Sequence, residues 1–141
     1  MIVERLAVHS KRRYIGKVIR KILTIFCVSI PETTQIGDNV KFVHNAPGTI
    51  LHEKAIIEDN VRIYQGVTLG RADIYNSDSK VEKILIKKGA ILCAGAKVLC
   101  KNKVIIVGEN SVIGANSVLL ESTGDNEIWA GVPARYIKKR D

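Results

Sequence analysis

An aliphatic residue returns about every six positions from Ile36 to Leu120, and a small residue follows four places after many of them. A period of six fits neither the 3.6-residue turn of an α-helix nor the two-residue alternation of a strand. It is typical of a parallel β-helix, in which each hexad forms one short strand and one corner. We therefore expect a mainly β chain whose hexads, three to a triangular coil, build roughly four coils. The clearest hexads are IGDNVK, LHEKAI, IEDNVR, IYQGVT, IKKGAI, LCAGAK, VGENSV and IGANSV.

The residue types within each hexad predict which side chains point inward. The leading Ile, Leu or Val is expected to fill the core, while the Gly, Asn and Asp residues tolerate the turns. Aromatic residues make up only 5% of the chain, which suits a narrow core of aliphatic side chains. The small residues expected at the tight corners are Val40, Ala55, Val61, Val67, Ala90, Ala96, Ser111 and Ser117.

Charge and cysteine content restrict the partners and the compartment. A formal net charge of +8 favours an anionic partner, and we prefer a phosphate-bearing cofactor because aromatic platforms for nucleic acid are missing. Cys27, Cys93 and Cys100 are an odd number in a chain where we recognise no secretory signal, which predicts reduced thiols in a cytoplasmic protein. We expect them to fill core or corner positions rather than act as nucleophiles. No apolar run approaches the ~18 residues of a membrane span.

The N-terminal segment differs in kind from the repeat. Its apolar residues recur at near-helical spacing between lysines and arginines, which predicts a basic amphipathic helix. Such a helix can cap the open end of a β-helix, and it can also lie on a membrane surface; the two roles are compatible. We therefore divide the chain into a helix and link over 1–30 and a β-helix domain with a C-terminal tail over 31–141.

The repeat is interrupted and then ends. Residues 71–83 are too many and too polar for one corner, so we expect a loop that projects from the prism and carries function. A shorter slip before Val107 predicts a bulged corner. After Leu120 the pattern stops, which predicts a turn, a short extended stretch and a basic tail.

His44 is the leading candidate for chemistry. Of the three histidines His9, His44 and His52, only His44 lies where the period slips, in KFVHNAPGT. The backbone is expected to leave the regular corner there. An imidazole, with an ordinary pKa of about 6.5, suits removal of a proton from a hydroxyl at neutral pH.

Four stretches carry a resemblance to a known family: IYQGVTLG at 63–70, ILCAGAKVL at 91–99, SVIGANSVLL at 111–120 and GVPARYI at 131–137. With them the chain resembles the left-handed β-helix acyltransferases of the hexapeptide-repeat superfamily, most closely the serine O-acetyltransferase branch. The resemblance extends from about Ser29 to Ile137. Without the large N-terminal helical domain of that branch, the chain is similar to acetyltransferases that modify sugars of surface polysaccharides.

The resemblance implies a homotrimer that binds acetyl-CoA between neighbouring prisms and uses no metal. By motif, His44 matches the catalytic histidine, and Ser29 stands where a carboxylate usually orients it. The Asp that usually precedes the histidine is Val43 here, so the customary His–Asp pair is absent. We expect the acetyl group to pass directly to an acceptor hydroxyl, with a backbone N–H near Gly70 or Arg71 stabilising the oxyanion. The residues assigned to acetyl-CoA are Arg71, Ala94, Gly95, Gly114, Ala115, Arg135 and Lys138.

The acceptor side departs from the family pattern. The Arg–His pair that holds the substrate carboxylate in serine acetyltransferases falls at Glu82 and Lys83. A sugar hydroxyl is therefore our expected acceptor, and free serine is the alternative that Arg71 and Lys83 keep open. The residues assigned to the acceptor are Asn45, Glu53, Gln65, Tyr75 and Lys83.

Two other classes of protein share this prism. The γ-class carbonic anhydrases need three zinc-binding histidines, and the repeat region offers only His44 and His52. A non-catalytic β-helix scaffold would keep the coils and lose the base, and the altered His–Asp pair keeps that alternative open.

Overall fold

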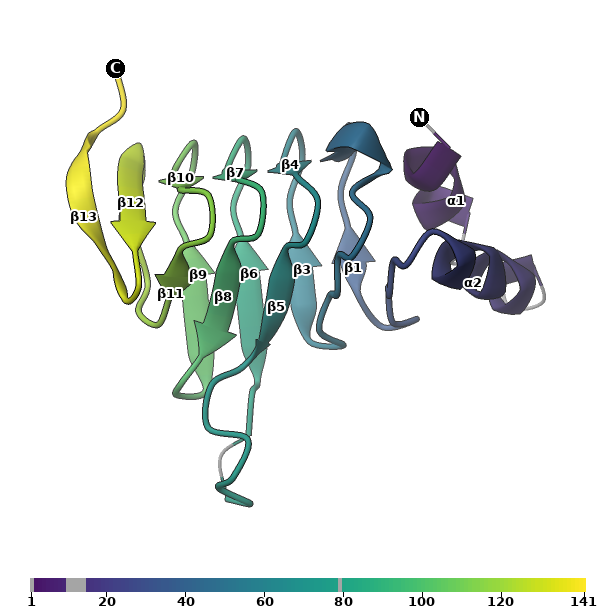
Figure 1. The fold of residues 1–141 in the computed structure, drawn as a ribbon, viewed down its shortest axis with the longest axis horizontal. Helices are drawn as coiled ribbons and strands as arrows, with labels where there is room; N and C mark the ends of the chain where they lie inside the picture. Colours follow the sequence, from purple (N-terminus) through teal and green to yellow (C-terminus); the bar gives the residue numbers. More distant parts are fainter. Residues whose placement is uncertain (1, 10–14, 79) are drawn as a thin grey trace.

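The computed structural model describes the chain apart from Met1, residues 10–14 and residue 79. The described strands wind into a triangular prism with two helices at one end and an antiparallel hairpin at the other (Figure 1). Successive coils add short parallel strands to three faces, as the six-residue period predicts.

Each face is one parallel sheet. The first face contains β1 (Gln35–Ile36), β3 (Ala55–Ile57), β6 (Lys83–Ile86) and β9 (Val104–Val107). The second contains β2 (Lys41–Phe42), β4 (Arg62–Ile63), β7 (Ile91–Leu92), β10 (Val112–Ile113) and β12 (Glu127–Gly131), with β13 (Ala134–Lys139) antiparallel at its end. The third contains β5 (Thr68–Arg71), β8 (Lys97–Cys100) and β11 (Val118–Leu119).

The third face continues toward the helices through isolated bridges. Ser29 pairs with Ile50, and Ile50 pairs with Thr68, all in parallel. Ser29, which we assigned to the link, is thus already part of the first coil.

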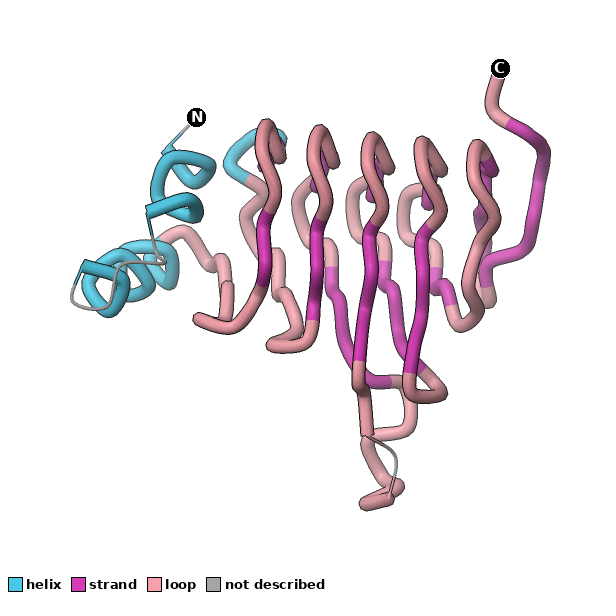
Figure 2. The backbone as a smooth tube through the Cα atoms, turned by 180° about the vertical axis from the view of Figure 1, so that it is seen from behind, coloured by secondary structure: helices cyan, strands magenta, loops and turns pink. Residues whose placement is uncertain are grey.

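Two edges of the prism matter for function. The histidine edge, between the second and third faces, is formed by residues 43–48, 64–66, 93–95 and 114–116. The loop edge, between the third and first faces, is formed by residues 52–54, 72–82 and 101–103, and its longest segment projects well beyond the coils (Figure 2).

The leading residues of the hexads fill the core, as predicted. Apart from Ile36, which is half-buried, they are no more than 2% exposed, and each such burial stabilises the fold by roughly 1.5–3 kcal/mol. The eight small corner residues are buried as well. The leading residues are Leu51, Ile57, Ile63, Leu69, Ile86, Leu92, Val98, Val107, Ile113 and Leu119.

The N-terminal segment forms two helices rather than the one expected. α1 (Ile2–His9) and α2 (Ile15–Ile25) pack on the first coil, with Val3, Ala7, Ile19 and Leu23 buried in the common core. The Glu4 carboxylate also accepts a hydrogen bond from the Phe42 N–H at 3.1 Å. The predicted cap is therefore confirmed, while the His9 side chain lies outside the described part.

The C-terminal segment is more ordered than the predicted extended stretch and tail. β12 pairs in parallel with β10 and so extends the second face, and β13 returns antiparallel to β12. The hairpin covers the end of the prism opposite the helices (Figure 1). Among the described residues, no helix combines the length and apolar character needed to cross a membrane.

Candidate active site

The corner that carries His44 is longer than the corner stacked on it. Five residues separate Phe42 from Gly48, whereas two separate the equivalent Ile63 and Gly66 on the next coil. The extra residues form a single 3₁₀ turn, Val43–Asn45. This insertion explains why the hexad period slips at His44.

The inserted turn holds three consecutive residues in the left-handed region. The φ angles of His44, Asn45 and Ala46 are 55°, 60° and 42°. Asn and His are enriched among the non-glycine residues found there, whereas Ala46 adopts a conformation that costs about 1–3 kcal/mol. Such strain clusters at functional sites, and here it turns the His44 side chain outward to an exposed position.

The His44 ring packs against Tyr64 and is otherwise open. The two ring centroids are 6.4 Å apart, with an interplanar angle of 65°. Within the described part of the chain, neither the His44 ring nitrogens nor the Ser29 hydroxyl makes a hydrogen bond. Contact between Ser29 and His44 therefore stays a prediction.

Asn45 presents an unsatisfied acceptor beside His44. Its side-chain oxygen is buried and has no hydrogen-bond partner among the described residues. A buried polar atom without a partner costs about 1–3 kcal/mol. A hydrogen-bond donor from a ligand, a water molecule or another copy of the chain would satisfy this oxygen.

Small residues continue the histidine edge along the prism. The Gly95 N–H donates to the Gln65 carbonyl, and the Asn116 N–H donates to the Ala94 carbonyl, so these corners stack directly. The edge thus runs from His44 over the residues that we assigned to the pantetheine arm of acetyl-CoA. These are Ala94, Gly95, Gly114 and Ala115, none of which carries a side chain beyond Cβ.

Lys97 and Asn116 fix the shape of this edge. The Lys97 ammonium donates to the carbonyls of Gly66 and Gly95, at 2.8 and 3.0 Å, and so ties two turns together. Gly95 has a φ of 71°, and the Asn116 amide fills the space where a side chain on Gly95 would lie. These two contacts therefore restrain the backbone along the edge.

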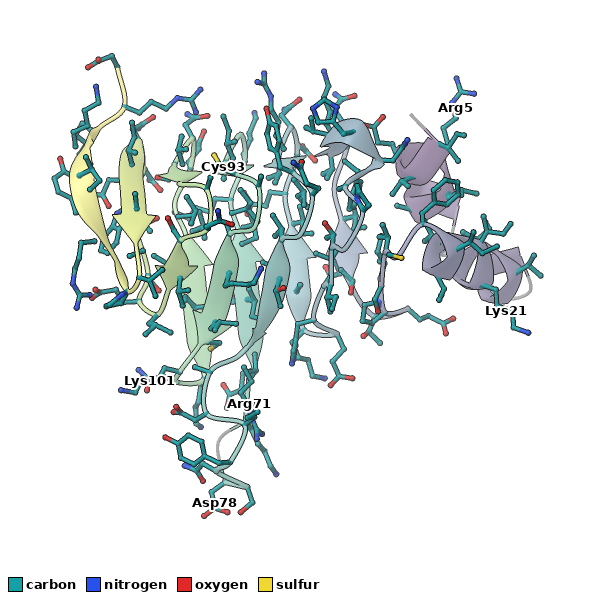
Figure 3. All side chains as sticks on the ribbon, viewed as in Figure 1. Arg5, Lys21, Arg71, Asp78, Cys93 and Lys101 are labelled. Carbon is teal, nitrogen blue, oxygen red and sulfur yellow. The ribbon has the colours of Figure 1, made fainter. Side chains whose placement is uncertain are left out.

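Cys93 and Cys100 are poor candidates for a catalytic nucleophile. Cys93 lies on the histidine edge directly after β7 (Figure 3), and burial raises the pKa of its thiol. Burial also raises the pKa of Cys100, which fills the core as predicted. Protonated thiols are poor nucleophiles, so His44 remains a better candidate for a catalytic residue than either thiol. Cys27 is exposed, which corrects its expected place in the core or a corner.

The loop edge holds a separate group of polar residues. Arg71 lies where the third face meets the projecting loop, and Asp78 marks the tip of that loop (Figure 3). The Arg71 guanidinium donates to the Ile74 carbonyl at 2.8 Å. Beneath the loop lies an open hollow of about 600 Å³, lined by Asp73, Asn76, Asp78, Lys80, Glu82, Lys101, Asn102 and Lys103.

His52 lies on the loop edge and was not among the predicted site residues. Desolvation by burial lowers its pKa most; the charges of Lys54 and Arg71 lower the pKa further, and Glu53 opposes them. Its Nδ1 accepts the Lys54 N–H at 3.1 Å, so the proton of the neutral ring is on Nε2. Ile50 pairs in parallel with Thr68, so two residues further along both segments His52 lies beside Gly70.

The acceptor residues that we predicted divide between the two edges. Asn45 and Gln65 lie on the histidine edge with His44. Glu53, Tyr75 and Lys83 lie on or beside the loop edge, at the other side of the third face. One chain alone therefore does not bring them together.

Strand β5 carries the two predicted oxyanion donors, Gly70 and Arg71. The Thr68 and Ala72 N–H groups donate toward β8, whereas the Leu69 N–H donates to the opposite side. Because N–H groups alternate along a strand, the Gly70 N–H points toward β8 and the Arg71 N–H points away from it. The choice between Gly70 and Arg71 as the oxyanion donor therefore stays a prediction.

The basic residues assigned to the CoA phosphates lie in the terminal hairpin. Arg135 pairs with Glu121 at 3.0 Å and Lys138 with Asp141 at 3.7 Å. All four side chains are more than half exposed, and exposed pairs stabilise a fold by only about 0–1 kcal/mol. A phosphate can therefore displace either carboxylate at little cost. The described residues contain no group of three or more His, Cys, Asp or Glu side chains that could hold a metal ion.

The chain is similar to serine acetyltransferases over most of its length. No protein-family model matches it. It is 38% identical over 110 residues to a putative serine acetyltransferase of Schizosaccharomyces pombe, covering 78% of this chain and 38% of the relative. It is 37% identical over 119 residues to the serine acetyltransferase of Haemophilus influenzae, covering 84% of this chain and 42% of the relative. The chain thus spans about two fifths of the length of these curated relatives.

A solved structure agrees with both sequence matches. The serine acetyltransferase of Brucella abortus in complex with coenzyme A superposes with a TM-score of 0.75 at 33% identity, covering 96% of this chain and 56% of that one. The expected left-handed β-helix is confirmed.

Proposed function

We propose that this chain, a hexapeptide-repeat left-handed β-helix that resembles the serine O-acetyltransferase branch, transfers an acetyl group from acetyl-CoA to an acceptor hydroxyl. The observation that carries the proposal is the histidine edge. There a strained turn presents His44 at one end of a rigid strip of small residues. Such a strip allows a long, thin thioester to lie against the backbone with its acyl end near the base.

The reaction follows from these positions. His44 removes the proton of the acceptor hydroxyl as the oxygen attacks the thioester carbonyl. The oxyanion is stabilised by a backbone N–H at Gly70 or Arg71. Collapse of the intermediate breaks the C–S bond, and the imidazolium returns the proton to the leaving thiolate. General base assistance of this kind contributes about 10²–10⁴-fold to the rate.

The two edges are complementary if the protein is a homotrimer. His44 and Arg71 lie at opposite sides of the third face of one chain. In a threefold arrangement, the loop edge of one copy can face the histidine edge of the next. The base and the acceptor-binding groups would then come from different copies, and acetyl-CoA would lie between them.

Free serine replaces the sugar hydroxyl as the proposed acceptor. The loop composition favoured a sugar, but the relatives are named serine acetyltransferases, which supports the alternative. Serine carries a carboxylate, and a forked cation is its best partner. Glu82, at the position of one member of the usual Arg–His pair, is anionic and pairs with Lys103 at 3.0 Å.

Arg71 and His52 supply a replacement pair on the loop edge. They lie close enough for the Arg71 charge to lower the pKa of His52. The Nε2–H of His52 and the N–H groups of Arg71 together suit a carboxylate. We propose that this pair holds the serine carboxylate, that Lys83 adds charge, and that Tyr75 and Glu53 line the approach.

Acetyl-CoA is the proposed co-substrate, and the residues present fit it. Its pantetheine arm would follow the small residues of the histidine edge, and its phosphates would meet Arg135 and Lys138. The free thiols of Cys27, Cys93 and Cys100 suit a reducing compartment, so we place the reaction in the cytoplasm.

Thiol release from acetyl-CoA tests the proposal. The full chain is incubated with acetyl-CoA and either L-serine or a panel of nucleotide sugars and oligosaccharides, and products are identified by mass spectrometry. We expect thiol release that depends on L-serine and yields O-acetylserine. Release with sugars alone would restore the sugar acceptor, and no release with any acceptor would favour the non-catalytic scaffold.

A further inference from the structure

We propose that α2 docks the protein onto an anionic lipid surface, through an apolar stripe formed by Val18, Ile22 and Ile25. These residues are spaced i, i+4 and i+7, so they share one face of the helix. Val18 is 60% exposed, Ile25 is 79% exposed, and Ile22 is half-buried.

The stripe is not needed to cap the prism. Ile19 and Leu23, which point toward the core, are 6% and 0% exposed and already cover the first coil. α2 is therefore apolar on two sides, one buried and one presented to solvent. An exposed apolar face on a helix that is already packed indicates a second binding partner.

The charge around the stripe selects the kind of partner. Residues 1–26 contain seven Lys and Arg residues and one acidic residue, so this segment carries +6 of the formal net charge of +8. Lys21 is exposed between Val18 and Ile25 in sequence, and Arg5 and Lys21 both extend away from the body (Figure 3). Exposed apolar side chains on a segment rich in Lys and Arg match the interface of a membrane with anionic headgroups.

The position of α2 leaves the candidate active site accessible. The helices lie at one end of the prism and the terminal hairpin lies at the other (Figure 2). A surface that meets α2 therefore leaves both the histidine edge and the loop edge open to small molecules.

Vesicle co-sedimentation of the full chain tests the inference. Vesicles of phosphatidylcholine alone are compared with vesicles of phosphatidylcholine mixed with phosphatidylglycerol. We expect sedimentation only with the anionic vesicles, and release of the protein when the salt concentration rises. Sedimentation with neither kind of vesicle would overturn the proposal.

Matched variants locate the contact. Val18→Ser with Ile25→Ser should weaken anionic-vesicle binding by about tenfold or more, because two apolar side chains no longer leave water. Val132→Ser, at a residue 72% exposed in the hairpin at the opposite end, should leave binding unchanged. Unchanged binding by the double variant would overturn the proposal. Light scattering of the double variant gives a second check. A particle mass half that of the unmodified protein would also overturn the proposal, because it would show that the stripe joins copies of the chain. Circular dichroism confirms that each variant is folded.

Discussion

The rings of His44 and Tyr64 meet edge to face, with their centroids 6.4 Å apart and their planes at 65°. Tyr64 begins the corner stacked on the His44 turn, so the next coil supports the candidate base directly. Since no hydrogen bond within the described part of the chain holds the imidazole, this ring contact is its main lateral support.

Tyr64→Ala should therefore loosen His44 without removing it. We expect kcat for acetyl transfer to fall by about tenfold, in line with the roughly 0.5–1.5 kcal/mol of an aromatic pair. Tyr64→Phe keeps the ring and should retain activity. Equal losses in the two variants would show that the phenol hydroxyl, rather than the ring contact, matters.

Gly95 and Gly66 provide a matched pair for testing the rigidity of the histidine edge. Both have left-handed φ angles, 71° and 70°, but only Gly95 faces the Asn116 amide. Gly66→Ala should cost about 1 kcal/mol of folding free energy from backbone strain, and Gly95→Ala about 1–3 kcal/mol more from overlap. Chemical denaturation measures both. Adding Asn116→Gly to Gly95→Ala should restore part of the loss, and no restoration would contradict the packing described.

The hexad period was enough to predict a parallel β-helix, whereas the site residues stay predictions. It identified the leading core residues, the small corner residues and the slip at His44, because inward and corner positions recur in a triangular coil. It did not distinguish α1 from α2, since both helices share one continuous apolar pattern. It also missed the pairing of β13, because Lys138 and Lys139 resemble a solvated tail and their role depends on β12.

The division of the site between two edges was harder to foresee. The loop at 71–83 and the insertion at 43–45 break the count of hexads, so residues such as Tyr75 and Gln65 cannot be assigned to an edge from spacing alone. His52 was considered but not assigned to the site, because it occupies an ordinary corner position and its proposed role depends on Arg71 on the neighbouring coil.

The lowered pKa of His52 makes the stability of the fold depend on pH. Because the unfolded state binds this proton more readily, the contribution of His52 is fully present above the ordinary pKa of about 6.5 and is lost as pH falls through the lower folded-state pKa. His52→Gln removes the titration, so stability measured by urea unfolding should fall less steeply from neutral to mildly acid pH. An identical pH dependence in the two proteins would contradict the burial of this ring.

The proposed carboxylate pair predicts a change in KM rather than in kcat. Arg71→Ala and His52→Ala should each raise KM for L-serine by about 10–100-fold, because a charged hydrogen bond to the substrate is lost. KM for L-serine amide, which lacks the carboxylate charge, should change little. Lys83→Ala is the control within the same edge and should have a smaller effect. Unchanged KM for L-serine in both variants would place the carboxylate elsewhere while leaving the acetyl transfer itself intact.

The most direct test of the account is acetyl transfer by the His44→Ala variant, with acetyl-CoA binding measured in parallel by calorimetry. The account predicts that kcat falls by about 10²–10⁴-fold while the affinity for acetyl-CoA is retained, because His44 acts on the acceptor proton and the small-residue edge holds the cofactor. Turnover by His44→Ala at the rate of the unmodified chain would contradict the central claim that this strained turn presents the general base.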